Sequence, residues 1–219
     1  VDIKNGIMGT SAIVGGAMPI AIGAALASQM RNDKRVSVGF FGDGAVDEGA
    51  FHESLNFAAL KRLPAIFICE NNFYATNSPL LARQPADNIF KRAKPYMISG
   101  IRSDGNDIIK VYKSAKDAIE SARRGNGPAL IEYRTYRYKQ HVGTRYDHEV
   151  GYRPKEELDR WIKNCPIKRF KNFLLKDNLI SLNEIKRIQA RIDREIEEAV
   201  VFAKNSRFPD KDELLEDVY

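Results

Sequence analysis

Cysteine is scarce in this sequence, which contains two among 219 residues. Cys69 and Cys165 lie far apart and form no CxxC pair, so a disulfide framework and a structural zinc site are disfavoured, and a reducing compartment fits. Residues 5–30 carry no charge, but glycines, a proline and several polar residues interrupt them, and bulky aliphatic residues are few. That stretch is therefore predicted to be neither a membrane span nor a signal peptide.

Internal repeats and low-complexity segments are absent too, and the composition is 43% hydrophobic and 29% charged. Such a composition is typical of a soluble globular protein and excludes collagen, coiled coils and intrinsic disorder. The 35 Lys and Arg residues exceed the 29 Asp and Glu residues, which gives a formal net charge of +6. Acidic residues are interspersed almost throughout, as in residues 191–198, whereas nucleic-acid-binding modules concentrate their basic residues on one face. Nucleic-acid binding is therefore only a remote alternative.

Short apolar runs alternate with amphipathic stretches over the first two thirds of the chain. Four runs predict strands, at 35–41, 64–69, 95–99 and 129–133. Three stretches predict helices, at 17–31, 48–60 and 107–124. Strands separated by helices indicate an α/β fold with a mainly parallel sheet flanked by helices. The glycine-rich residues 6–16 are expected to form a buried loop before the first helix.

The character of the sequence changes after the fourth predicted strand. Residues 137–153 are polar and basic with no regular period, which predicts a loop. Three helices are expected beyond it, at 154–161, at 166–176 and, opened by a capping box of Ser181 and Glu184, at 181–204. We therefore divide the chain into an α/β domain, residues 1–153, and a helical C-terminal extension, residues 154–219, with an acidic tail.

The tripeptide Gly42-Asp43-Gly44 lies where the first predicted strand ends and a helix begins. Ligands of open α/β sheets bind at the carboxyl ends of strands, and the two glycines allow the backbone to approach a phosphate. Because a carboxylate would repel a bare phosphate, Asp43 is best explained as a ligand of a divalent cation such as Mg²⁺. Asn72 ends the next strand 29 positions later, so the two side chains can meet at one ion. Each motif taken singly is explained equally well as an ordinary turn.

The residues between these two positions resemble one family, the alpha subunit of the dehydrogenase component of 2-oxo acid dehydrogenase complexes. Pyruvate, branched-chain and acetoin members share the pattern. The matching segments are 13–19, 42–49, 63–64, 66–72, 103–107, 136–138 and 151–153, with Glu53, Asn56 and His141. The resemblance covers nearly the whole chain. It implies a thiamine diphosphate-binding fold, with thiamine diphosphate and Mg²⁺ as cofactors.

The resemblance also implies which residues hold these cofactors. Mg²⁺ would be bound by the side chains of Asp43 and Asn72 and by the main-chain carbonyl of Tyr74. The backbone amides of Gly44 and Ala45 would donate hydrogen bonds to diphosphate oxygens, as expected near the N-terminus of a helix.

Two further segments receive roles from the same resemblance. The backbone of Ile13 and Val14 would contact the aminopyrimidine, and His141 would lie beside the diphosphate and the reaction centre as the catalytic residue. The loop around His141 would be ordered by Tyr138, Tyr152 and Arg153. Val142 stands where mitochondrial pyruvate-type enzymes carry a regulatory serine, so kinase control is not expected.

The expected function is that of an alpha subunit in the oxidative decarboxylation of a small 2-oxo acid, with acyl transfer to a lipoyl carrier. The resemblance implies a beta subunit in an α2β2 heterotetramer, activity only with that subunit, a lipoyl-bearing acyltransferase core, and a cytoplasmic or organelle-matrix location. Family members have a further N-terminal segment, so we expect this chain to be N-terminally truncated. An acetoin dehydrogenase alpha subunit and a transketolase-type N-terminal half remain the enzyme alternatives.

Overall fold

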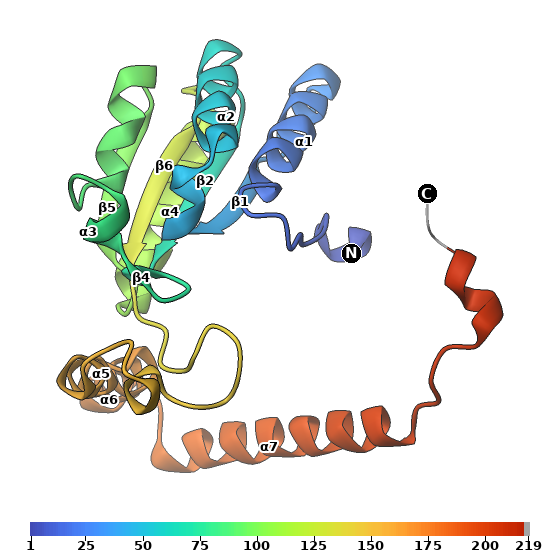
Figure 1. The fold of residues 1–219 in the computed structure, drawn as a ribbon, viewed down its shortest axis with the longest axis vertical. Coiled ribbons are helices and arrows are strands. Elements are labelled where there is room, and N and C mark those ends of the chain that lie inside the picture. The colour runs from blue at the N-terminus through green and yellow to red at the C-terminus, as the bar shows by residue number, and fades with distance from the viewer. Residues whose placement is uncertain (217–219) are drawn as a thin grey trace. The chain divides into compact units, whose positions relative to one another are not determined.

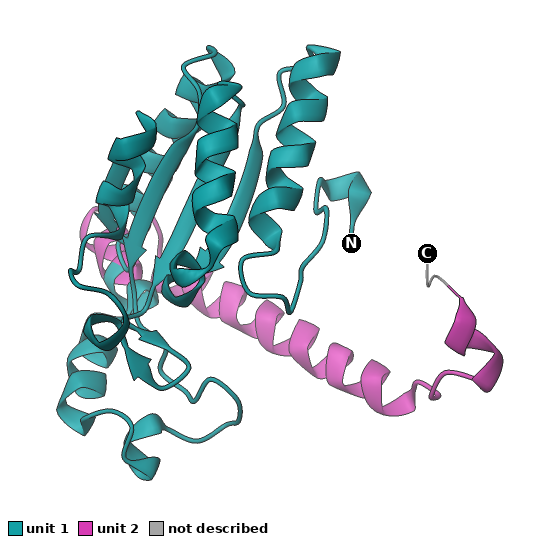
Figure 2. Cartoon of the chain, turned by 45° about the horizontal axis from the view of Figure 1, so that its top comes forward, with its two compact units in different colours: residues 1–169 teal, residues 170–219 magenta. Residues whose placement is uncertain are grey.

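The computed structural model describes residues 1–216, and the chain forms two compact units, residues 1–169 and residues 170–219. Figure 2 shows the first unit in teal and the second in magenta. The first unit contains the sheet and extends beyond the loop 137–153, because it also includes the helix α5, Lys155–Lys163. The domain boundary after residue 153 stays a prediction.

The first unit is built on a parallel four-stranded sheet in the order β1-β2-β6-β5 (Figure 1). Its strands are β1 Ser37–Gly42, β2 Ala65–Asn71, β6 Ala129–Arg134 and β5 Ser99–Asp104. All three neighbouring pairs are parallel. The predicted α/β class with a mainly parallel sheet is therefore confirmed, and the arrangement is consistent with a thiamine diphosphate-binding fold.

Helices cover both faces of this sheet. On one face, α1 Ala17–Arg31, α2 Gly49–Leu60 and the 3-10 segment η3 Ile89–Tyr96 pack in one core with Phe67 and Cys69 of β2. On the other face, α4 Ile108–Arg123 packs against Ile66 and Ile68 of the same strand. Successive side chains of a strand point to opposite faces, which explains why β2 is a continuous apolar run.

The strand predicted at 95–99 is wrong. Pro95 lies within η3, and β5 begins only at Ser99. As the edge strand, β5 is mostly polar, so its sequence has no apolar run to reveal it. Its position is fixed by packing instead, because a Cβ at Gly100 would collide with the carbonyl oxygen of Phe90 in η3.

Short elements and the loop fill the remainder of the first unit. They are η1 Ile3–Asn5, η2 Asp43–Asp47, β3 Tyr74–Ala75, β4 Ser78–Pro79, α3 Leu80–Arg83 and η4 Asp147–Val150. The glycine-rich loop is predicted to be buried, but most of it is exposed. Residues 6–14 are all exposed, and burial begins at Gly15, where an added Cβ would contact the side chains of Glu48 and Met18. No described segment packs over the part that precedes Gly15.

The C-terminal helices agree with the sequence. They are α6 Pro166–Lys176 and α7 Leu182–Asn205. The short segment η5 Lys211–Leu215, in the acidic tail, is not predicted by the sequence. The capping box that opens α7 is present, since the Glu184 amide donates to Ser181 Oγ at 3.2 Å and the Ser181 amide donates to Glu184 Oε2 at 2.8 Å. The end of the acidic tail, residues 217–219, lies outside the described residues. Among the residues described, none of the helices has the length and apolar character needed to cross a membrane.

Candidate functional site

Asp43 and Asn72 lie together at the carboxyl ends of two neighbouring strands. Asp43 directly follows β1 and Asn72 directly follows β2, and the Asn72 backbone amide donates to Asp43 Oδ1 at 3.3 Å. Asp43 is fully buried. The Asn72 side-chain oxygen, Oδ1, is also buried and has no hydrogen-bond partner among the described residues. Buried polar atoms are rarely left unpaired, so an unpaired oxygen close to a buried carboxylate is suited to serve as a cation ligand.

The Asp43 carboxylate is stabilised by an arginine that the sequence analysis did not identify. Arg83 Nη2 lies 2.6 Å from Asp43 Oδ2, and Arg83 Nη1 pairs with Asp47. Burial raises the pKa of Asp43, and the neighbouring guanidinium offsets part of that rise. Gln84 holds the same segment by donating from Nε2 to the Asp43 carbonyl at 3.2 Å. No local pattern signals Arg83, because tertiary packing brings it across 40 positions.

A short hairpin covers the N-terminus of η2. The hairpin pairs β3 with β4, and an added Cβ at Gly44 would lie 2.7 Å from the Cβ of Ala75. Gly44 and Ala45 therefore lie directly beneath the hairpin that carries Tyr74, the residue predicted to give a main-chain carbonyl to the cation. The first amides of a helix have no intrahelical acceptor, so they can bind an anion.

Replacing Gly44 with alanine is expected to destabilise the first unit by about 1–3 kcal/mol, because the new methyl group overpacks the contact with Ala75. Urea unfolding measures the change. The matched control is Gly49→Ala at the start of α2, where an added Cβ meets nothing closer than 3.9 Å. If both variants unfold at the same urea concentration, the close packing of the hairpin on η2 is wrong.

The loop 137–153 is anchored by a buried ion pair. Arg153 and Asp147 are 4% and 3% exposed, and Arg153 Nε lies 3.0 Å from Asp147 Oδ2. Arg153 Nη1 donates to the carbonyl of Arg137 at 3.1 Å. The Arg153 guanidinium also lies 4.0 Å from the centre of the Tyr74 ring, a cation–π contact. Arg153 therefore connects the loop to the hairpin of the Asp43 site.

The other predicted site residues are not joined to Asp43 by a described contact. His141 is exposed in the loop 137–153, and Ile13 and Val14 are 76% and 58% exposed before α1. Among the loop residues, Tyr138 donates from its hydroxyl to the carbonyl of Trp161 at 3.3 Å, and Tyr152 is exposed. The roles of His141, Ile13 and Val14 stay predictions.

The donor set at Asp43 fits Mg²⁺ better than a transition metal. Within residues 1–216, no group of three or more His, Cys, Asp and Glu side chains is arranged to hold a metal ion. Magnesium does not need such a group, because it is usually bound by one or two carboxylates with substrate phosphates and water. One carboxylate, one amide oxygen and one main-chain carbonyl are therefore an appropriate protein contribution.

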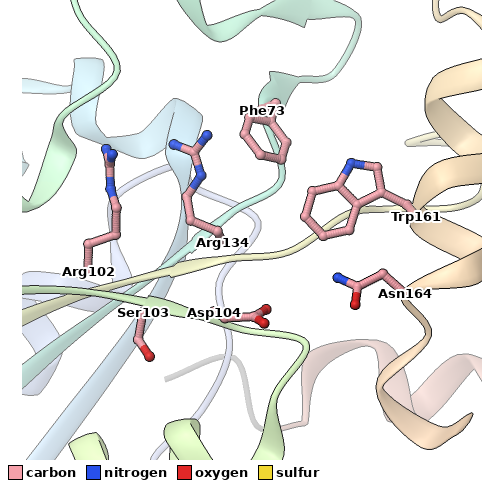
Figure 3. A pocket seen from close by; sticks show the side chains of 7 residues that line it. All are labelled: Phe73, Arg102, Ser103, Asp104, Arg134, Trp161 and Asn164. Carbon is pink, nitrogen blue, oxygen red and sulfur yellow. The ribbon is translucent and has the colours of Figure 1, made fainter. Parts of the chain in front are cut away.

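A cavity of about 450 Å³ lies at the ends of β5 and β6 (Figure 3). It is lined by Phe73, Arg102, Ser103, Asp104, Arg134, Trp161 and Asn164. Its two guanidinium groups are already neutralised, since Arg102 and Arg134 both pair with Asp87 and with the fully buried Glu132. The cavity therefore presents no free cation to an anionic ligand, and its lining does not include Asp43 or Asn72.

Comparison with known proteins identifies the family. The model of the dehydrogenase E1 component matches residues 2–212. The chain belongs to the dehydrogenase E1 component family. Its relatives in this family include the alpha subunit of acetoin:2,6-dichlorophenolindophenol oxidoreductase from Bacillus subtilis, 42% identical over the whole chain and 64% of the relative.

Two further relatives of this chain are named as subunits of other dehydrogenases. The chloroplastic pyruvate dehydrogenase E1 component subunit alpha-3 of Oryza sativa is 37% identical over 98% of the chain and 52% of the relative. The alpha subunit of 3-methyl-2-oxobutanoate dehydrogenase from Mycobacterium tuberculosis is 39% identical over 91% of the chain and 54% of the relative. The resemblance to E1 alpha subunits is therefore confirmed. The chain spans about half to two thirds of the length of these relatives.

Proposed function

We propose that this E1 component chain binds thiamine diphosphate through a divalent cation and serves as an alpha subunit in the oxidative decarboxylation of a 2-oxo acid. The observation that carries the proposal is the site at Asp43. Two successive parallel strands end in a buried carboxylate and in an amide whose oxygen has no hydrogen-bond partner within residues 1–216. The names of the relatives support the same class of reaction.

The residues of the site have distinct roles in holding the cofactor. Asp43, the Asn72 side-chain oxygen and the Tyr74 carbonyl would bind Mg²⁺, while the amides of Gly44 and Ala45 would donate to diphosphate oxygens. When bound, thiamine diphosphate would supply the electron sink that the decarboxylation of a 2-oxo acid requires.

Two other segments complete the proposed site. The exposed backbone of Ile13 and Val14 would hold the aminopyrimidine ring, and the exposed His141 imidazole would exchange a proton with the substrate or hydrogen-bond the diphosphate. Arg153 connects the two ends of the loop that carries His141, since it pairs with Asp147 and donates to the carbonyl of Arg137.

The proposed partners follow from the family. They are a beta subunit in an α2β2 heterotetramer, a lipoyl-bearing acyltransferase core and a small 2-oxo acid, with the protein located in the cytoplasm or an organelle matrix. A second candidate is an acetoin dehydrogenase alpha subunit. It is favoured by the 42% identity to the acetoin:2,6-dichlorophenolindophenol oxidoreductase subunit.

Activity assays on the full chain test the proposal and separate the two candidates. The chain is mixed with a beta subunit, thiamine diphosphate and Mg²⁺. Release of carbon dioxide from a 2-oxo acid with acylation of lipoamide supports the first candidate, whereas acetoin-dependent reduction of dichlorophenolindophenol supports the second. The chain alone and the mixture without thiamine diphosphate are expected to be inactive. Turnover in either control, or no turnover with any of these substrates, contradicts the proposal.

A further inference from the structure

The guanidinium group of Arg83 lies at the proposed cation site. Arg83 lies between two carboxylates, with Nη2 2.6 Å from Asp43 Oδ2 and Nη1 paired with Asp47. Its side chain is 15% exposed, whereas the side chains of Asp43 and Asp47 are 1% and 32% exposed. One guanidinium therefore connects a buried carboxylate to a carboxylate that reaches solvent.

We propose that Arg83 is an internal counter-ion of the cation site, which neutralises Asp43 until a divalent cation binds and is then held by Asp47 alone. The inference rests on the proposed function, because it assumes that the cation binds Asp43. It adds two residues to the site, Arg83 as a competitor of the cation and Asp47 as the acceptor of the displaced guanidinium.

Their proximity makes the two positive groups compete for the Asp43 carboxylate. A bound Mg²⁺ lies about 2.0–2.1 Å from each oxygen ligand. With Arg83 Nη2 2.6 Å from the same carboxylate, cation and guanidinium would be close neighbours in a buried site, where like charges repel strongly. This repulsion favours the release of the guanidinium from Asp43 when the cation binds.

With Arg83 paired to Asp43, two buried polar atoms at the site lack hydrogen bonds to the described residues. Arg83 Nε is buried without a hydrogen-bond partner among the described residues, and so is Asn72 Oδ1. No nitrogen of the Arg83 guanidinium donates to Asn72 Oδ1, whereas a cation bound at Asp43 could accept a lone pair from that oxygen. Displacing Arg83 toward Asp47 also brings its Nε closer to water. Both changes favour the exchange.

The backbone around Arg83 is suited to a movement of the side chain alone. Gln84, which is 2% exposed, donates from its backbone amide to the Leu80 carbonyl at 2.9 Å and from Nε2 to the Asp43 carbonyl at 3.2 Å. These bonds hold α3 against η2 whatever the position of the guanidinium. The rotation of one side chain is therefore sufficient.

Binding of Mn²⁺ alone to the full chain, followed by electron paramagnetic resonance, tests this inference. Arg83→Gln is expected to bind Mn²⁺ roughly tenfold more tightly than the wild type, since a charge-assisted pair no longer has to be broken. The matched control is Arg92→Gln, which removes a positive charge whose Nη1 donates to the Val46 carbonyl of η2 at 2.9 Å. The control is expected to change the affinity about twofold or less. Equal effects of the two variants overturn the inference, because a through-space charge effect then suffices.

A second substitution tests the role of Asp47 and does not depend on the folding of the first variant. Asp47→Asn is expected to weaken Mn²⁺ binding in the presence of Arg83, because the displaced guanidinium loses its acceptor. In the Arg83→Gln background the same change should have a clearly smaller effect. Equal effects in both backgrounds overturn the inference. Failure of the proposed function gives a different result, namely that Asp43→Asn leaves Mn²⁺ binding at the level of the wild type.

Discussion

Replacement of Asp43 with asparagine is expected to weaken the magnesium-dependent binding of thiamine diphosphate by on the order of 100-fold. Substitutions in the outer shell of a metal site typically cost about 10–100-fold in affinity, and Asp43 would be a direct ligand that contributes the charge. Isothermal titration of the full chain with thiamine diphosphate, in Mg²⁺ and in chelator, measures the effect. In chelator the wild type and the variant should bind the cofactor alike.

The stability of the Asp43→Asn variant shows whether the loss is local. Burial raises the pKa of Asp43 above its usual range, so its ionised form is disfavoured in the folded state. A carboxyl group with a raised pKa stabilises the fold at low pH and loses that contribution as pH rises through the raised value. Near neutral pH the neutral amide should therefore not lower the urea midpoint. The control is Asp117→Asn, on the exposed side of α4. It should change neither the affinity for thiamine diphosphate nor the urea midpoint. Undiminished cofactor affinity in Asp43→Asn contradicts the metal assignment.

Replacement of Arg153 with methionine is expected to cost about 3–5 kcal/mol of stability, because it leaves the Asp147 carboxylate buried without its closest partner. The remaining partner, Arg137, lies 3.3 Å from Asp147 Oδ2 and offsets only part of the loss. Urea unfolding measures the global change. Limited proteolysis measures the local one, and new cleavage is expected within residues 137–153.

Arg145→Met is the matched control for this loop. Arg145 also pairs with a carboxylate, with Nε 3.2 Å from Glu149 Oε2, but its side chain is 63% exposed. Exposed pairs contribute little, so the control should cost about 0.5 kcal/mol or less. Combining Arg153→Met with Asp147→Leu should recover part of the stability, since the buried Asp147 carboxylate is then no longer left without its closest partner. If the two arginine variants are equally stable, the loop is not anchored by Arg153.

The sequence predicts correctly the elements whose signal lies in neighbouring residues, such as a helix cap or a strand that is buried on both faces of the sheet. The apolar run of β2 and the capping box at Ser181 each carry their signal in neighbouring residues. β5 was misplaced because an edge strand needs no apolar run, and its position depends on the contact between Gly100 and the Phe90 carbonyl. Such a contact depends on how η3 folds back on β5, and the apolar pattern of the sequence does not reveal it.

The same distinction applies to the candidate site. Asp43 and Asn72 could be paired in advance because successive parallel strands place their carboxyl ends side by side. The contacts of Arg83 with Asp43 and Asp47 could not be predicted, because they depend on how α3 folds back over η2. The exposure of Ile13 was also not predicted, since burial of a glycine-rich loop depends on what packs over it.

The central claim is that a divalent cation binds thiamine diphosphate to this chain between Asp43 and Asn72. Anomalous diffraction from crystals of the full chain grown with thiamine diphosphate and Mn²⁺, which scatters anomalously in place of Mg²⁺, tests it most directly. We predict one strong peak bonded to the Asp43 carboxylate, the Asn72 side-chain oxygen and the Tyr74 carbonyl, with Arg83 on Asp47. A cofactor-bound crystal in which the peak lies elsewhere and Arg83 still pairs with Asp43 would contradict the account.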